Sequence, residues 1–402
     1  MYHNAIGCSV HFDRYAYSKE EAERLKDYPR AQYAYGLNAW ARLDIESAGR
    51  YFRQSVTKDP LFIDGWLRLA EVEKAMGNKE KALEILNFTI ECSPDVYRWK
   101  WPQMLLARDL GLEEVVSRNA NYLLSRGILK QDTLQFLHTY FSGNASAVVS
   151  VMDAKHLSTY LDWLMKWSMT EKSLTVWHAM ADAVEPEKET ALRYADFLLH
   201  KKRIDTAKKI WRKYTGPADL TNPGFETEYT GKGFDWCYWN EEYGNIEVMR
   251  VKHDVREGDY SLRLQFNGRE NIDFHHYYQI FATDPLSSYR LTYAWKSHGI
   301  TTDQGFFMEI LGYDAGVLYA SGPQITGTHG WREESIEFVT PEKCRAGIIR
   351  LRRLPSLRFD SKIRGTLWLD DFRLEKIDDK LQQLPVEMKN SQLHPLAKKN
   401  DK

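Results

Sequence analysis

Cysteine is scarce in this sequence. The 402 residues contain four cysteines, and even the closest two, Cys8 and Cys92, lie 84 positions apart. No pair therefore has the CxxC spacing of a zinc site, and a small fold held together by disulfides is excluded. We expect all four residues, including Cys237 and Cys344, to be buried single thiols.

Long apolar runs are also missing. No stretch reaches the roughly 18 to 20 apolar residues that cross a bilayer, and the first twenty residues lack a cationic start followed by an apolar core. We therefore expect no membrane span and, for the chain as written, a cytoplasmic protein. Residues 5–8 faintly resemble a lipoprotein cleavage box. If the start codon has been placed too late, a signal or anchor segment is missing from the sequence, and we would instead expect a periplasmic or membrane-anchored protein.

Charge of one sign is not in excess. Lys and Arg number 55 and Asp and Glu 56, for a net charge of −1, so no basic field is available to bind nucleic acid. The sequence does have length for two or three domains and many aromatic residues, with 13 Trp, 23 Tyr and 17 Phe. Such residues gather in repeat seams, in sandwich cores or on sugar-stacking surfaces, and composition does not choose between these.

A 34-residue period runs through the first part of the chain. Three residue types share it, in the pairs Pro60 and Pro94, Ala48 and Ala82, and Gly77 and Gly111. Small residues let two antiparallel helices approach closely, large apolar residues fill the seam, and proline ends the second helix. Residues 29–62 and 63–96 are two such units and resemble the tetratricopeptide repeat, which implies stacked helical hairpins.

The repeat pattern weakens after residue 96. Residues 97–130 form a degenerate third unit, while 155–186 and 188–214 again predict helical pairs. We expect five or six stacked hairpins in a helical repeat domain at 29–214. Before it, Ser18-Lys-Glu-Glu21 looks like a capping box that begins a leading helix in an N-terminal segment, 1–28.

The period changes at Thr215-Gly216-Pro217. From Leu220 onward, runs such as 261–266, 289–295 and 366–374 alternate apolar and polar residues and are separated by Gly, Asn, Asp and Pro. This two-residue period predicts an antiparallel β-sandwich at 220–377, after a linker at 215–219. The expected fold class is multidomain α plus β, an α-solenoid followed by a sandwich, with a polar, disordered tail at 378–402.

Six short motifs follow one another along the second half of the chain. They are Asn222-Pro-Gly-Phe-Glu226 opening the first strand, Asp235-Trp236, Arg256-Glu-Gly-Asp-Tyr-Ser-Leu262, Tyr289-Arg-Leu-Thr-Tyr293, Gly330-Trp331 and Leu367-Trp-Leu-Asp-Asp-Phe372. Together they resemble carbohydrate-binding modules of the jelly-roll type. The resemblance implies the fold more firmly than sugar binding, because the same sandwich hosts many functions.

Enzyme signatures are missing. The sequence has no GxxxxGK[ST], GxGxxG, GxSxG or HExxH motif, so we expect no catalytic activity and no catalytic cofactor. In the densest cluster, at 273–278, the adjacent His275 and His276 are expected to point to opposite faces of a strand and not to share a metal ion. Asp370 and Asp371 are expected to diverge in the same way, which disfavours a carboxylate pair for glycoside hydrolysis.

For these acids, the resemblance to carbohydrate-binding modules implies a structural calcium site. It brings together Glu226 and Asp370, with Asp371 as the alternate, and completes an oxygen cage with backbone carbonyls around Gly258. Calcium prefers such hard oxygen ligands. In the alternative, Glu226 simply pairs with a neighbouring arginine or lysine.

Sugar binding requires aromatic faces that stack on pyranose rings and polar groups that hydrogen-bond hydroxyls. The candidates are Trp236, Tyr238, Trp239, Tyr243, Tyr278, Tyr313, Glu309, Arg350 and Arg352. If Ile349 and Leu351 face the core, Arg350 and Arg352 face outward together and, with Arg353, leave that sheet face cationic. Such a face suits an acidic polysaccharide. In the alternatives, the aromatic residues serve core packing, and the arginines form a patch docked on the helical half or an exposed surface of salt bridges.

The helical half offers a protein-binding surface. In tetratricopeptide arrays the first helix of each pair lines a concave groove that takes an extended peptide or a helix. The matching positions are Arg30, Tyr33, Leu37, Trp40, Asp64, Leu67, Glu71 and Lys74. In the alternative, residues 18–28 cover this groove.

The sequence therefore predicts a non-enzymatic interaction protein that binds protein partners through its repeats and glycan through its sandwich. The combination suggests an accessory scaffold in bacterial polysaccharide synthesis, export or surface attachment, a context that rests on the resemblance alone. The alternatives are a pure protein-protein scaffold whose sandwich has no ligand and, more distantly, an unrecognised glycan-active enzyme.

Overall fold

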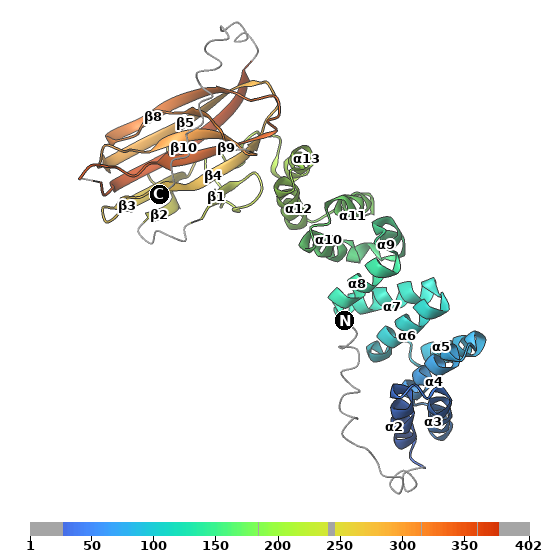
Figure 1. Ribbon diagram of the computed structural model, residues 1–402. Coiled ribbons are helices and arrows are strands. Elements are labelled where there is room, and N and C mark those ends of the chain that lie inside the picture. The colour runs from blue at the N-terminus through green and yellow to red at the C-terminus, as the bar shows by residue number, and fades with distance from the viewer. Residues whose placement is uncertain (1–26, 184, 240–245, 315, 360, 378–402) are drawn as a thin grey trace, which may run out of the picture. The chain divides into compact units, whose positions relative to one another are not determined.

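The computed structural model describes residues 27–183, 185–239, 246–314, 316–359 and 361–377. Over these residues, twelve α-helices precede ten β-strands (Figure 1). Contacts between residues divide the chain into two compact units, Met1–Glu185 and Pro186–Lys402. No helix in the described ranges combines the length and the apolar character needed to cross a membrane.

The first unit consists of antiparallel helical pairs. Its helices are α2 (Pro29–Ala41), α3 (Ile45–Lys58), α4 (Ile63–Ala75), α5 (Lys79–Cys92), α6 (Tyr97–Leu110), α7 (Glu113–Ser125), α8 (Lys130–Tyr140), α9 (Ala145–Val151), α10 (Leu157–Lys166) and α11 (Thr170–Ala183), with a 3-10 turn, η1 (Ala154–His156), before α10. The pairs expected at 29–62 and 63–96 form, and so does the degenerate third. The α8–α9 pair occupies residues for which the pattern predicts no hairpin.

The packing of the first pairs follows from the periodic residues. A Cβ atom on Gly36 would lie 2.5 Å from the ring of Phe52, so only glycine lets α2 approach α3 this closely. Gly77, with φ at +87°, forms the turn between α4 and α5. Helices α3 and α5 end two residues before Pro60 and Pro94. The packing predicted from the 34-residue period is confirmed.

The second unit contains one more helical pair and the β-sandwich. The pair is α12 (Lys188–His200) and α13 (Ile204–Thr215), which makes six pairs in the described part of the chain. The strands are β1 (Trp236–Tyr238), β2 (Ile246–Val251), β3 (Ser261–Asn267), β4 (Phe274–Ala282), β5 (Ser288–Ile300), β6 (Phe307–Gly312), β7 (Leu318–Ser321), β8 (Gly327–Val339), β9 (Ala346–Arg353) and β10 (Arg364–Ile377). The predicted change from helix to strand-rich chain coincides with the end of α13.

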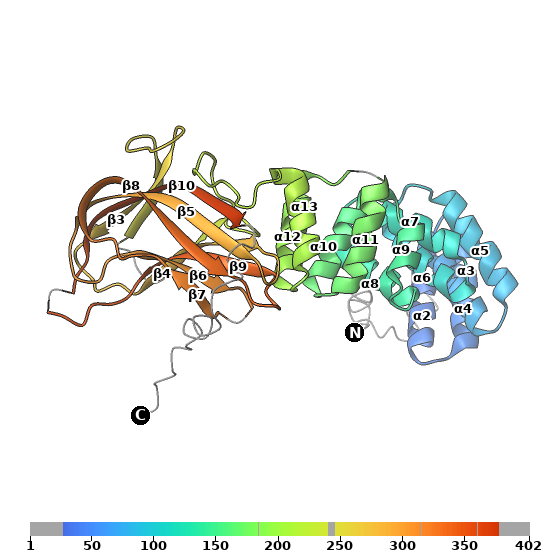
Figure 2. The ribbon, with the colours of Figure 1, turned by 90° about the horizontal axis from the view of Figure 1, so that it is seen from above.

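The strands form two five-stranded antiparallel sheets. Sheet A has the order β1-β4-β9-β6-β7, and sheet B has the order β2-β3-β10-β5-β8. Figure 2 shows them as two layers, with β3, β5, β8 and β10 in one and β4, β6, β7 and β9 in the other. The predicted fold class, a helical region followed by an antiparallel sandwich, is confirmed.

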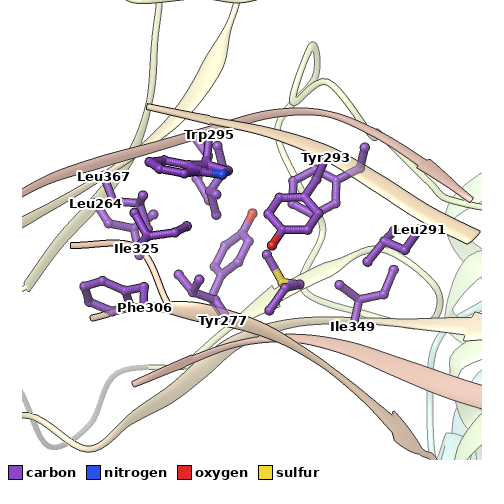
Figure 3. Packing of buried hydrophobic residues seen from close by; sticks show 14 of the residues in the cluster. Leu264, Tyr277, Leu291, Tyr293, Trp295, Phe306, Ile325, Ile349 and Leu367 are labelled. Atoms are coloured by element: carbon purple, nitrogen blue, oxygen red, sulfur yellow. The ribbon is translucent and has the colours of Figure 1, made fainter. Parts of the chain in front are cut away.

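Aromatic side chains fill the space between the sheets. Tyr277 of sheet A and Tyr293 of sheet B both point into it (Figure 3). The Phe266 and Phe306 rings stack with centroids 4.7 Å apart, and the Tyr293 and Phe372 rings stack at 5.6 Å. Much of the aromatic content of the second half therefore serves core packing.

Two local expectations are wrong. Residues 222–226 form a turn and do not open a strand, because Asn222 and Phe225 have positive φ angles of 50° and 59° that a strand does not accommodate. Cys92 is exposed at the end of α5, whereas Cys237 and Cys344 are buried as expected.

Three further expectations fall outside the described residues. They concern Cys8 as a buried thiol, the capping box at 18–21 and the tail at 378–402.

Candidate functional site

Sheet A has one face in the core and one facing away from it. On β9, Ile349 and Leu351 belong to the hydrophobic core. The intervening Arg350 and Arg352 are partly exposed on the other face, which we refer to as the outer face. The outward orientation predicted from strand alternation is confirmed.

Neighbouring strands add polar groups beside these arginines. The register places Tyr278 of β4 and Glu309 of β6 directly opposite Arg350. Asp273, just before β4, reaches Arg352. The outer-face cluster is therefore made of Asp273, Tyr278, Glu309, Arg350 and Arg352.

The arginines of the cluster are paired with acids. Arg350 donates to Glu309 Oε2 through Nη2 at 2.7 Å and Nε at 3.1 Å. Arg352 donates to Asp273. Arg353 points into the protein, where it is fully buried. The expectation of a cationic face is wrong, because two carboxylates offset two guanidinium groups.

Trp239 is an exposed aromatic residue next to this cluster, because it contacts His275, whose Nδ1 lies 3.8 Å from Asp273 Oδ1. It follows β1 and is 45% exposed, and its ring lies edge-on to His276 at 4.7 Å and to His275 at 5.8 Å. Tyr278 is half-buried on the outer face, and burial raises the pKa of its hydroxyl to about 12. Near neutral pH this hydroxyl both donates and accepts hydrogen bonds.

The two histidines lie together. The register of β4 shifts between Phe274 and Tyr277, and the His275 and His276 rings stack with centroids 4.3 Å apart. The expectation that these side chains point to opposite faces is wrong, because an irregularity of this kind breaks strand alternation. Over the described ranges, no group of three or more His, Cys, Asp and Glu side chains is placed to hold a metal ion.

Trp236 and Tyr238 turn toward the core of the sandwich. Trp236 is 1% exposed and stacks on Tyr277 at 5.2 Å within the core. Tyr238, two residues further on the same strand, packs against the same core. The prediction for Trp236 is wrong, because alternation turns both residues inward and leaves Cys237 on the outer face. Tyr238 is only partly buried, and its role in a sugar site stays a prediction.

Tyr313 is covered on one side. Lys202, in the turn between α12 and α13, places its Nζ 3.6 Å from the centre of the Tyr313 ring and 2.8 Å from Asp314 Oδ1. That ring face is therefore closed to a sugar, contrary to expectation. Tyr243 lies outside the described residues.

More contacts attach the α12–α13 pair to the sandwich. Asp196 of α12 accepts a hydrogen bond from the Gly233 backbone N–H at 2.7 Å. Trp211 of α13 lies 6.0 Å from Phe234, centroid to centroid, and donates through Nε1 to Thr221. Sequence reasoning missed this contact, because the pair has the same helical pattern as the repeats before it.

Glu226 and Asp370 hold one loop from two directions. Asp370 is fully buried, and its Oδ2 accepts the backbone N–H groups of residues 256–257 at 2.8 and 3.2 Å. Glu226 Oε1 accepts those of residues 259–260 at 3.2 and 3.3 Å. Gly258 between them has φ at +75°, and a Cβ there would lie 2.2 Å from Glu226 Oε1.

These two acids fit part of a calcium site. Burial raises the pKa of Asp370, since its charged form loses water, and a bound cation would offset that cost. Backbone N–H groups of the loop already donate to both carboxylates, and N–H groups cannot bind a cation. Calcium takes about six to eight oxygen ligands, so backbone carbonyls would have to supply the rest. Asp371 contacts Arg373 instead. The predicted calcium site therefore stays a prediction.

The groove candidates on α4 are engaged with neighbours. The charged ones form ion pairs, Asp64 with Arg98 at 3.0 Å, Glu71 with Arg68 at 2.6 Å, and Lys74 with Asp109. Leu67 is 4% exposed, so its assignment to the groove is wrong.

The candidates on α2 are more accessible. Arg30 is exposed, and Tyr33, Leu37 and Trp40 are half-buried. The Tyr33 ring also packs against Phe62 at 5.0 Å. Among the groove candidates, the accessible ones are therefore those on α2.

The chain thus combines a region of antiparallel helical pairs with an antiparallel β-sandwich. No protein-family model matches it, and no curated protein does. Among solved structures, it is similar to the TmCBM61 module in complex with β-1,4-galactotriose, at 16% identity over 40% of this chain and 99% of that one, with a TM-score of 0.28.

Two further solved structures are similar. One is a CBM4 structure, at 14% identity over 39% of this chain and 99% of that one, with a TM-score of 0.30. The other is the CBM22-1 xylan-binding domain of Xyn10C from Paenibacillus barcinonensis. It has 14% identity over 38% of this chain and 91% of that one, with a TM-score of 0.26. These neighbours are carbohydrate-binding β-sandwiches, but at such TM-scores they carry no argument about the ligand.

Proposed function

We propose that the protein binds glycan on the outer face of sheet A and protein partners along its helical repeats, and that it acts by binding alone. The observation that supports glycan binding is the exposed ring of Trp239 beside the outer-face cluster. An aromatic face next to paired acidic and basic groups is the combination that stacks on a sugar and hydrogen-bonds its hydroxyls.

The charge balance of the cluster bears on the glycan class. Glu309 and Asp273 offset Arg350 and Arg352, so the reason for preferring an acidic polymer is removed. A paired arginine and carboxylate still offer donors and acceptors to hydroxyl groups. We therefore propose a neutral polysaccharide as the ligand.

The protein-binding half of the proposal rests on α2. Arg30, Leu37 and Trp40 keep exposed surface there, whereas the charged groups of α4 are engaged in ion pairs. A chain that holds a glycan at one unit and a protein at the other would act as an accessory scaffold in polysaccharide synthesis, export or surface attachment.

Affinity electrophoresis in gels that contain neutral or acidic polysaccharide tests the glycan site. Trp239→Ala should weaken retardation about tenfold, the effect of removing one large stacked ring, at low and high salt alike. Trp167→Ala, which removes another exposed tryptophan, from the helical unit, is the matched control and should behave as wild type.

The same gels distinguish the alternatives. If no polysaccharide retards the intact protein, glycan binding is wrong and the pure-scaffold alternative stands. Retardation by acidic polymers alone, lost at high salt, would overturn the neutral ligand. Release of reducing ends from a retarding polymer would show a glycan-active enzyme.

A further inference from the structure

The loop between β9 and β10 displays two large apolar side chains in full contact with solvent. Leu357 is 101% exposed and Phe359 is 107% exposed. The next most exposed large apolar residues of the described chain are Leu43 at 83% and Leu61 at 76%. Since single surface apolar residues are normally partly covered by neighbours, two fully uncovered ones in three positions require an explanation.

The base of this loop is held firmly. Ser356, immediately before Leu357, is buried, and its Oγ donates to Asp303 Oδ1 at 2.6 Å while its N–H donates to Asn271 Oδ1 at 2.9 Å. The buried Arg353 donates to the carbonyl of Ser361 at 3.1 Å. The two apolar side chains therefore project from an anchored base.

Cationic side chains flank the apolar pair. Arg358 lies between Leu357 and Phe359 with 77% of its side chain exposed, although its Nε also contacts Asp303 at 3.0 Å. Lys362 and Arg364 follow and are exposed. The sequence of residues 354–364 contains these three cations and one acid, Asp360, which lies outside the described residues.

The β9–β10 loop and the α12–α13 pair make contacts at different ends of β6. β6 begins at Phe307, shortly after Asp303, and ends at Gly312, next to Tyr313. The loop contacts Asp303, whereas Lys202, in the turn between α12 and α13, contacts Tyr313. The loop and the helical pair thus lie at opposite ends of sheet A.

We infer that the β9–β10 loop is a membrane-surface anchor, in which Leu357 and Phe359 insert into a bilayer and Arg358, Lys362 and Arg364 bind anionic lipid headgroups. A protruding tip of this kind suits a deformable apolar layer, since a rigid protein partner would have to supply a matching pocket. Apolar insertion combined with attraction to anionic lipid is the basis of peripheral membrane binding.

Flotation of the full-length protein with lipid vesicles tests this inference. Wild type should float with vesicles of phosphatidylcholine and phosphatidylglycerol, and less with phosphatidylcholine alone. Leu357→Ser combined with Phe359→Ser should lower the partition coefficient at least tenfold, because two large apolar side chains no longer leave water. Arg358→Gln combined with Lys362→Gln should remove most of the dependence on phosphatidylglycerol.

The matched control is Leu43→Ser combined with Leu61→Ser, which alters the next most exposed apolar residues and should leave flotation unchanged. All these positions are exposed, so equal melting temperatures should accompany the differences in flotation. The inference is wrong if wild type stays with the soluble fraction, or if the Leu357 and Phe359 variant floats as well as wild type. It is also wrong if that variant converts a dimer to a monomer by light scattering without vesicles, which would place a second copy on the tip.

Discussion

Trp236 and Trp239 lie three positions apart and have opposite environments. Trp236 belongs to β1 and stacks on Tyr277 inside the core, whereas Trp239 follows the strand and keeps nearly half of its surface exposed. The sequence identifies both as aromatic candidates for sugar stacking. Alternation places residues three positions apart on opposite faces, so only one of the two rings can face the core. Which of them does so is decided by how β1 packs against the other sheet, and this is not a property of the local sequence.

This difference predicts separate effects on stability. Trp236→Ala should lower the free energy of unfolding by about 3 to 5 kcal/mol, since it leaves a large cavity between the sheets. Trp239→Ala should change it by less than about 1 kcal/mol. Urea titration of the two variants measures both values. A small effect at Trp236 would show that its ring is not part of the packed core.

At the scale of elements, the loop at 256–260 joins two distant parts of the sandwich. Glu226 approaches it from the turn that precedes β1, and Asp370 approaches it from β10. The motifs that suggest a calcium site thus mark two acids that do meet at one loop. Whether a cation joins them depends on carbonyl positions, which residue type does not specify, because every residue has a carbonyl.

Calcium binding predicts a dependence of stability on chelator. If calcium binds only the folded sandwich, saturation at about a hundred times its Kd adds roughly 2.7 kcal/mol. EDTA should therefore lower the melting temperature by several degrees, and Glu226→Gln should make the melt insensitive to EDTA. Glu228→Gln, which alters a nearby exposed acid, is the control and should keep the wild-type response. A wild type indifferent to EDTA would leave the two acids as partners of the loop N–H groups alone.

At the scale of the whole molecule, the last helical pair groups with the sandwich. The division of the chain falls between Glu185 and Pro186, although helices continue to Thr215. Trp211 and Phe234 pack together across the boundary that the change of period predicts. The assignment of domains at 214 and 220 remains a prediction about folding units.

Two fragments of the chain test which of these boundaries is that of the folding unit. A fragment of residues 186–377 should melt several degrees above one of residues 216–377, because each buried Trp or Phe side chain contributes about 1.5 to 3 kcal/mol. Thermal unfolding followed by circular dichroism measures the difference. Equal melting temperatures would mean that the helical pair adds nothing to the sandwich and that the unit begins after the helices.

The sequence by itself determined most of the elements and the order of the two halves. A period of 34 residues with small residues at the seams specifies helical hairpins, and a period of two specifies strands, because both signals are local. The hairpins at 29–96 and the outward orientation of Arg350 and Arg352 followed from such patterns. The α8–α9 pair did not, because its residues lack the period.

Tertiary structure alone decided which candidate residues meet. Glu309 of β6 neutralises Arg350 of the neighbouring strand β9, Lys202 covers Tyr313 from the turn between two helices, and a shift in register brings His275 onto His276. These contacts join residues from different elements or depend on an irregularity of pairing. Local patterns carry no information about either, because they report which face a residue occupies and not what lies opposite it.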